Sequence, residues 1–249
     1  MLIRPDGAGA LAIGQLSHSW LAGQLARAWG NERFGELESR EELVLGAEQH
    51  DIGWATFDLE PRLNPDTGLP LSFLEISAEQ HLQIWRDAPD RLLSQSFRAA
   101  LLVSLHGSSL SQLRARRAPE HAAMLQAHVE RERARQSELT GRLSLTAEQI
   151  ERDRALLWAW DGISLALCCR WRPFTATEVP SVDGRLDVEL RELEAGAYTL
   201  DPWPFAGDRL EVRCEARRLE GGYRDESAMR AAYAAAEPVT LRFALAAPF

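Results

Sequence analysis

Residues 155–169 read Ala-Leu-Leu-Trp-Ala-Trp-Asp-Gly-Ile-Ser-Leu-Ala-Leu-Cys-Cys, an apolar run interrupted by a single carboxylate, Asp161. Thr146 and Gln149 precede this run with the spacing of a capping box, which predicts that a helix begins there. A helix that is apolar on every face is buried, so we expect this one to lie at the centre of the fold. An unpaired buried carboxylate costs several kcal/mol, so Asp161 needs a cation, a hydrogen-bond network or a proton.

Helical spacing of apolar residues continues upstream of the central helix. It predicts helices over residues 16–29, 39–57, 77–87, 90–113 and 119–140. Ser39 and Glu42 give the second of these a capping box, and Ser77 and Gln80 do the same for the third. The last segment alternates in charge sign, which is typical of a solvent-exposed helix.

Downstream of Pro173 the pattern changes to period two. Residues 186–190, 209–215 and 239–243 alternate between apolar and polar side chains, which predicts strands. Glycines at 7 and 9 predict a hairpin over residues 2–14 that joins them. We therefore expect a mainly α protein of the α+β class, with a small antiparallel sheet packed on a helical body. Residues 1–173 form the helical domain with its hairpin, and residues 174–249 form a β-rich appendage on the same body.

Composition narrows the function classes. The 249 residues carry 28 basic and 37 acidic side chains, for a formal net charge of −9. This charge argues against binding to nucleic acid polymers or anionic membranes. Every basic residue is arginine, which excludes mechanisms that need a lysine, such as a Schiff base or a Walker-A phosphate loop. No signal-peptide pattern or membrane-length apolar run is present, so we expect a cytoplasmic protein.

A His-Asp pair is the first candidate for chemistry. His50-Asp51 lies near the end of the helix predicted over residues 39–57, His18 lies in the first helix, and Asp161 lies in the central one. Imidazole and carboxylate are both good ligands for a divalent metal ion. Shared coordination of one ion would account for the buried Asp161. A salt bridge from an arginine such as Arg154 is the alternative.

These four residues, each on a predicted helix, resemble the HD-domain superfamily of metal-dependent phosphohydrolases. The resemblance implies an HD-domain-like helical body in which His18, His50, Asp51 and Asp161 ligate the ion. Further stretches across most of the chain are similar to an uncharacterised bacterial family of unknown function, which we interpret as a divergent HD-type branch. They are Gln15–His18, His50–Trp54, Asn64–Pro70, Leu102–His106 and Asp201–Phe205. Many HD proteins place a phosphate-binding lysine where this chain has Trp54, which weakens the phosphohydrolase inference.

His106 is the candidate fifth ligand. It is predicted to hold the same ion, to hold a second ion or to contact a phosphate, and a core histidine is the alternative. Three further residues are predicted to contact substrate. Trp54 would stack on a ring or line the core, His81 would reach the mouth of the pocket, and Asp58 would orient water. The proline-rich segment over residues 58–73 is expected to cover that mouth as a lid.

The remaining histidines and a basic cluster are expected to be structural. His121 and His128 lie seven residues apart on the charged helix and are expected at the surface. Arg114, Arg116 and Arg117 would either attract a phosphate or simply end a solvated helix.

The leading hypothesis is a metal-dependent hydrolase of phosphoester or nucleotide-type substrates. Asp51 would ligate the ion and orient the attacking water, and His106 would assist catalysis by steadying the leaving oxygen. The alternatives are an HD-type di-iron oxygenase and a non-catalytic HD-like binding protein. The sequence does not distinguish Mn, Fe, Mg, Zn, Co and Ni. The expected partner is a small-molecule substrate, phosphorylated or not, and a homodimer is left open.

Overall fold

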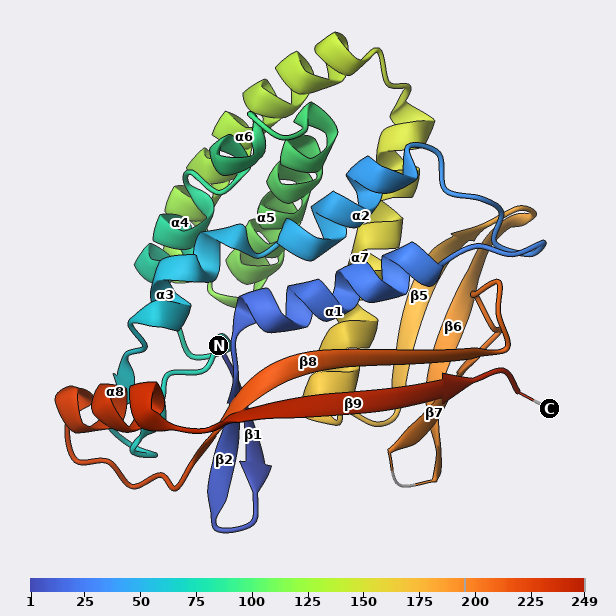
Figure 1. Cartoon of the computed structure of the whole chain (residues 1–249). Helices are drawn as coiled ribbons and strands as arrows, with labels where there is room; N and C mark the ends of the chain where they lie inside the picture. The colour runs from blue at the N-terminus through green and yellow to red at the C-terminus, as the bar shows by residue number, and fades with distance from the viewer. Residues whose placement is uncertain (195, 249) are drawn as a thin grey trace.

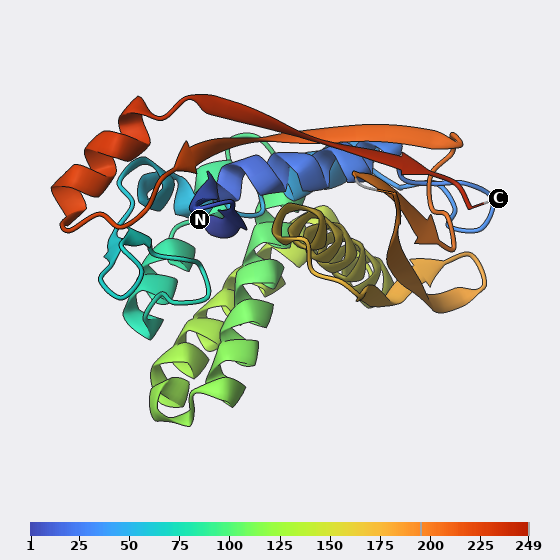
Figure 2. The same ribbon diagram turned by 90° about the horizontal axis from the view of Figure 1, so that it is seen from below.

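The computed structural model describes residues 1–194 and 196–248. Its dominant feature is a mixed seven-stranded sheet that curls around two long helices, α1 and α7 (Figures 1 and 2). The strand order is β1-β2-β8-β9-β7-β6-β5, in which β7 and β9 are parallel and the other neighbours antiparallel. The strands are β1 (Leu2–Asp6), β2 (Gly9–Ile13), β5 (Phe174–Ser181), β6 (Gly184–Glu194), β7 (Ala197–Asp201), β8 (Arg209–Leu219) and β9 (Pro238–Ala246).

Helices make up most of the region between the N-terminal hairpin and β5. They are α1 (Gln15–Ala28), α2 (Arg40–Gln49), α3 (Ala55–Leu59), α4 (Ala78–Trp85), α5 (Phe97–Arg117), α6 (Ala122–Leu143) and α7 (Ala147–Cys169), with α8 (Glu226–Ala235) lying later between β8 and β9. Helices α5 and α6 project away from the sheet as an antiparallel pair (Figure 2). Short 3-10 helices, η1 (Ile52–Trp54), η2 (Pro89–Leu92) and η3 (Pro119–His121), connect several of them. In the described part of the chain, no helix is both long and apolar enough to cross a membrane.

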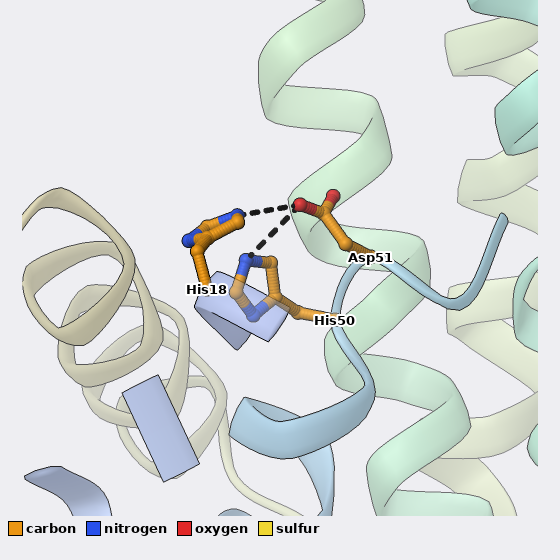
Figure 3. Close-up of side chains that lie close together, drawn as sticks. All are labelled: His18, His50 and Asp51. Atoms are coloured by element: carbon orange, nitrogen blue, oxygen red, sulfur yellow. Dashed lines mark hydrogen bonds and ion pairs between the residues drawn. The ribbon is translucent and has the colours of Figure 1, made fainter. Parts of the chain in front are cut away.

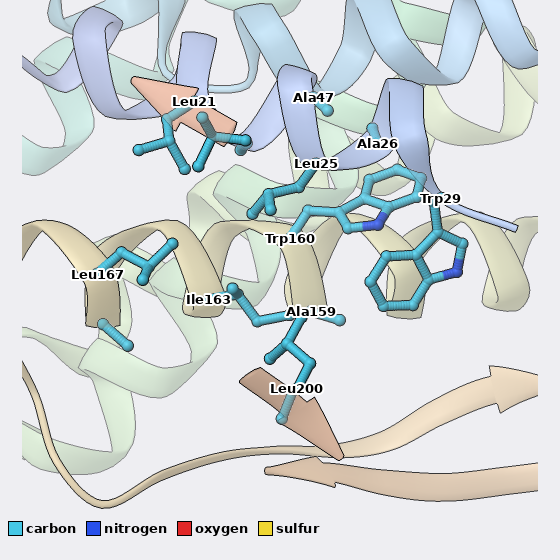
Figure 4. Close-up of a cluster of buried hydrophobic side chains, with 14 of the residues drawn as sticks. Leu21, Leu25, Ala26, Trp29, Ala47, Ala159, Trp160, Ile163, Leu167 and Leu200 are labelled. Atoms are coloured by element: carbon cyan, nitrogen blue, oxygen red, sulfur yellow. The ribbon is translucent and has the colours of Figure 1, made fainter. Parts of the chain in front are cut away.

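The prediction that residues 155–169 form a central helix is confirmed. The capping box forms as expected, with the Gln149 amide donating to Thr146 Oγ1 and the Thr146 amide donating to Gln149 Oε1. Figure 4 shows Trp160, Ile163 and Leu167 of α7 packed between α1 and Leu200 of β7. The helix is therefore enclosed on more than one side, as a helix without a polar face must be.

The predicted mainly α, HD-domain-like fold is wrong. Roughly half of the chain is helical, and the all-α core of that prediction is replaced by a core shared between helices and a large sheet. The alternating segments lie within much longer strands, because β6 and β8 each extend over 11 residues. The N-terminal hairpin pairs with β8 through β2, so one sheet contains strands from both ends of the sequence. Pairing between β7 and β9 is parallel, which makes the sheet mixed rather than antiparallel.

The helix predicted over residues 39–57 is also shorter than expected. Ser39 has a φ of 50° and forms no capping bond, and its hydroxyl instead accepts a hydrogen bond from Arg98. The helix ends at Gln49, after which the chain turns through His50 and Asp51 into η1. This early end matters because it places the adjacent side chains of His50 and Asp51 at a bend rather than about 100° apart around a continuous helix.

The charged helix is amphipathic rather than fully solvated. On α6, Leu125, His128, Val129 and Glu132 are buried against α5, and His128 is only 2% exposed. The expected surface position of His128 is therefore wrong. The alternating charges in the sequence hid the fact that the buried positions recur every three to four residues. That spacing places them on one side of the helix, where they pack against one neighbour.

Candidate metal centre

Four separate segments bring five ionisable side chains to one point among the helices. His18 comes from α1, His50 and Asp51 from the bend after α2, His106 from α5, and Asp161 from the middle of α7. All five are buried. Figure 3 shows His18 and His50 both directed at the carboxylate of Asp51.

The bend after α2 explains how adjacent residues face the same site. Asp51 has φ −102° and ψ 19°, a bridge-region conformation that is common in turns and at active sites. Gly53 then lets α4 pack directly against the bend, because a Cβ there would lie 2.2 Å from the Ile84 carbonyl oxygen. A residue with a side chain at position 53 would push the His50-Asp51 segment away from α4.

The separations between donor atoms match those around a metal ion. His18 Nε2 lies 2.7 Å from Asp51 Oδ2, and His50 Nε2 lies 3.3 Å from Asp161 Oδ1 and 3.7 Å from Asp51 Oδ2. His106 Nε2 lies 3.8 Å from Asp161 Oδ2. Ligand bonds of about 2.0–2.2 Å place neighbouring ligands about 3.0 Å apart at right angles and about 3.4 Å apart in a tetrahedron. These buried groups could therefore hold a metal ion.

Hydrogen bonds on the far side of two imidazoles orient their Nε2 atoms toward the carboxylates. The Ser164 hydroxyl donates to the Asp161 main-chain oxygen, so it accepts from His18 Nδ1 at 2.8 Å. His50 Nδ1 donates to the Ala47 carbonyl oxygen at 2.8 Å. In the neutral form, each ring then presents an Nε2 lone pair to a carboxylate, and two electron-rich groups face each other. A cation between them removes this conflict, and such outer hydrogen bonds commonly fix histidine ligands.

The electrostatics of the cluster favour a positive charge within it. Burial alone would lower the pKa of His50, but the carboxylates of Asp51 and then Asp161 raise it to about 9. Burial raises the pKa of Asp161, yet His50 and the other imidazoles bring it below its ordinary value. His50 Nε2 is buried and, among the described residues, has no hydrogen-bond partner. A metal ion would supply both the charge and the missing partner.

A pocket of about 380 Å³ opens onto this cluster. His18, Asp51, His106 and Asp161 all contribute to its lining. Most of its other lining residues are apolar, namely Trp54, Phe73, Leu74, Ile76, Trp85, Leu110, Leu113, Ala118 and Leu165. Gln15, His81, Arg114 and Arg117 complete the lining. The arrangement is that of a binding site with a few convergent polar groups in an apolar cavity.

Of the three residues predicted to contact substrate, the structure places two in the lining of the pocket and one outside it. Trp54 and His81 line the pocket, as expected of residues that meet a substrate there. Asp58 does not line it, because its Oδ2 accepts a hydrogen bond from the Leu16 amide at the start of α1. Gly14, the residue before that helix, has no side chain to cap it, and Asp58 supplies the missing acceptor.

The proline-rich segment is attached mainly to the C-terminal region rather than to the pocket. Its short strands β3 (Leu63–Asn64) and β4 (Leu69–Pro70) form a hairpin. The Leu63 amide donates to Glu226, Arg230 donates to the Pro61 carbonyl, and the Tyr223 amide donates to the Gly68 carbonyl. Of residues 58–73, Phe73 lines the pocket described above. The segment therefore does not cover the pocket as the expected lid, and only its last residue contributes to the pocket wall.

The alternative partner for Asp161, an arginine such as Arg154, is not found beside it in the described part of the chain. Arg154 binds Glu151 through two nitrogens, at 2.7 and 2.8 Å. Asp161 instead lies within 4 Å of a nitrogen of each of His18, His50 and His106.

Ser164 was not identified from the sequence, and Arg114 and Arg117 were expected either to attract a phosphate or to end a solvated helix. Ser164 orients His18, and Arg114 and Arg117 line the pocket. Helical spacing could have indicated all three, because Ser164 follows Asp161 by three residues, while Arg114 and Arg117 follow His106 by eight and eleven.

His81 is expected to make the metal-free protein sensitive to acid. Burial, followed by the charge of Arg114, lowers its pKa from 6.5 to about 3. Below pH 6.5 the unfolded chain therefore binds a proton that the folded chain does not, so stability falls as the pH drops from 6.5 toward 3. A His81→Gln variant should show a shallower fall in unfolding free energy, by about 1 kcal/mol per pH unit, in urea titrations between pH 6.5 and 4.5. An unchanged slope, equal to that of a His121→Gln control, would contradict this.

Comparisons with known proteins bear on the family rather than on the activity. No curated protein and no solved structure matches the chain. Residues 1–221 match a family described as a protein of unknown function, DUF3891. The predicted assignment to the HD-domain superfamily is wrong, since the match is to this family and the seven-stranded curled sheet is not an HD-domain helical fold. Because the match covers most of the sequence, the chain belongs to the DUF3891 family.

Proposed function

We propose that the protein is a metal-dependent hydrolase that cleaves a small phosphoester. The observation that carries this proposal is the convergence of three histidines and two aspartates at the base of an apolar pocket. Two arginines on the same pocket add positive charge that suits an anionic substrate. The proposal rests on these residues alone and does not depend on an HD-domain fold.

The donor set favours one ion over two. The two possible ligand groups, His18-His50-Asp51 and His50-His106-Asp161, share His50. Because His50 Nδ1 donates to Ala47, only Nε2 is free, and one nitrogen binds one ion. We therefore propose a mononuclear site, which supports the hydrolase over the di-iron oxygenase. Three imidazoles favour Zn, Fe, Co, Ni or Mn over Mg, which prefers oxygen ligands.

The residues of the pocket would have different roles in catalysis. A bound divalent ion would lower the pKa of water from 15.7 toward about 7 and polarise a phosphoryl oxygen. Asp51 lines the pocket and accepts a proton or hydrogen bond from the attacking water. His106 reaches the pocket from α5, where burial outweighs the nearby Asp161 and lowers its pKa to about 4, so it is neutral near pH 7 and can contact a substrate oxygen. Trp54 and Trp85 exclude bulk water from the reacting group.

Metal analysis and a phosphoester assay test this proposal together. Protein purified without chelator or affinity tag should contain one equivalent of a transition metal. It should hydrolyse 4-nitrophenyl phosphate or its bis-ester, and lose that activity when the metal is removed. Metal-free protein with full activity would refute the proposal, as would metal-loaded protein that hydrolyses neither ester.

Asp51→Asn should lower kcat for the phosphoester by at least about 100-fold, because the amide oxygen is a poor base and a weaker ligand. Circular dichroism should show unchanged helix content. Glu60→Gln, an exposed substitution a few residues along the chain, is the control and should leave kcat unchanged. An Asp51→Asn variant with wild-type kcat would remove Asp51 from the mechanism.

A further inference from the structure

One face of α5 connects the metal centre to the positively charged end of the pocket. His106, Leu110, Leu113, Arg114 and Arg117 all line the pocket, and their spacing places them on one side of the helix. With a rise of 1.5 Å per residue, Arg114 lies about 12 Å and Arg117 about 16 Å along the helix axis from His106. A ligand that reaches both ends is therefore elongated.

The two arginines are available to an anion. Arg114 donates from Nη2 to the Ile76 carbonyl, while its Nε is buried and lacks a partner among the described residues. Burial lowers the pKa of Arg114, and the charge of Glu79 only partly offsets this. By contrast, arginines of α6 do form ion pairs, namely Arg131 with Glu132, Arg135 with Asp90 and Arg142 with Glu138. In the described part of the chain, neither Arg114 nor Arg117 has such a pair.

The wall between the two ends is apolar. Leu110 and Leu113 lie between His106 and Arg117 on α5, and Phe73 and Trp85 line the same cavity. Trp85 packs so closely on α5 that a Cβ at Gly107 would lie 2.6 Å from its ring, which fixes the indole as part of the wall. A polyphosphate would leave this surface unmatched, whereas a hydrocarbon or aryl body would cover it.

We infer that the ligand of this pocket is an elongated amphipathic anion, whose carboxylate or phosphate binds Arg114 and Arg117. Its apolar body lies along Leu110 and Leu113, and its other end reaches the metal centre. That the end of the ligand at the metal centre is the reacting group rests on the proposed hydrolase function. The anion site stands on the arginines and the apolar wall.

Isothermal titration with simple amphiphiles tests the anion site. The probes are decanoate, decyl phosphate, decanol and acetate, each added to metal-loaded and to chelator-treated protein. We expect at least one of the two long-chain anions to bind about tenfold or more tightly than decanol and than acetate, because a charge-assisted bidentate contact adds to apolar burial. The tighter of decanoate and decyl phosphate identifies the preferred head group.

Arg114→Gln combined with Arg117→Gln should weaken binding of the long-chain anion by about tenfold or more in both forms of the protein, with unchanged metal content. Arg116→Gln is the matched control, because Arg116 is exposed on the same helix turn and does not line the pocket. Equal affinities for the double variant and the control would overturn the inference, as would decanol binding as tightly as the anions. Anion binding that persists in a protein without turnover would refute the hydrolase and leave the anion site intact.

Discussion

Alanine at His50 or at Asp161 is expected to abolish stoichiometric metal binding while leaving helix content nearly unchanged. Each residue contributes a donor atom to a buried cluster, and loss of a direct ligand should exceed the 10–100-fold that loss of an outer hydrogen-bond partner typically costs. Metal content by elemental analysis and affinity by titration measure this directly. Since a ligand that binds the folded state stabilises it, both variants should also lose the metal-dependent rise in Tm.

The control for these variants is chosen from the structure. His128 is unsuitable, because it is buried and its Nδ1 binds Arg131. His121 has a side chain 39% exposed, so His121→Ala should change neither metal binding nor the rise in Tm. The results for the two ligand variants could also contradict the shared site. If Asp161→Ala lowered Tm equally with and without metal and His50→Ala retained the ion, Asp161 would be a structural ion-pair partner only.

The sequence was most informative where one short segment determined its own structure. The capping boxes at Ser77 and at Thr146 both form, because each needs residues only three positions apart. The box predicted at Ser39 does not form, because its hydroxyl accepts a hydrogen bond from the distant Arg98 instead. The buried Asp161 on an otherwise apolar helix pointed to cationic partners, and the structure places three imidazoles beside it. That these residues bind a metal stays a prediction.

The sheet could not be predicted at its true size, because its pairing depends on residues far apart in the sequence. Ala10 of β2 pairs with Leu219 of β8, and Ala197 of β7 pairs in parallel with Ala244 of β9. Period-two patterns show that a strand exists and do not name its neighbour. The three short alternating segments therefore predicted only a small sheet. The same limit applies to Asp58, whose partner, the Leu16 amide, lies 42 residues away.

Charge patterning misled in a related way. A helix with acidic and basic residues at many positions was expected to be solvated, yet Glu132 is buried on α6. Its Oε2 accepts a hydrogen bond from Ser104 on α5 and lies 3.1 Å from Arg135 Nε. Burial of this acid depends on a partner from a second helix as well as on Arg135 of its own, and the sequence of one helix does not show that second helix.

Trp160→Ala is expected to cause the largest loss of stability of any single substitution considered, about 3–5 kcal/mol. Trp160 is 0% exposed and lies edge-on to Trp29, the residue that follows α1, with ring centroids 5.9 Å apart. Removing the indole leaves a cavity between α1 and α7 that the enclosing sheet prevents from closing. Urea unfolding monitored by circular dichroism measures the change.

A matched substitution on the same helix separates lost packing from a general effect of removing tryptophan. Trp158 lies two residues earlier on α7 and is 37% exposed, so Trp158→Ala removes the same atoms from a partly solvated position and should cost much less. Because α1 carries His18 and α7 carries Asp161, loosening their contact should also weaken metal binding in Trp160→Ala. Equal losses of stability in the two variants would show that Trp160 contributes no more packing energy than Trp158. Unchanged metal affinity in Trp160→Ala would show that the contact between α1 and α7 does not hold these ligands in place.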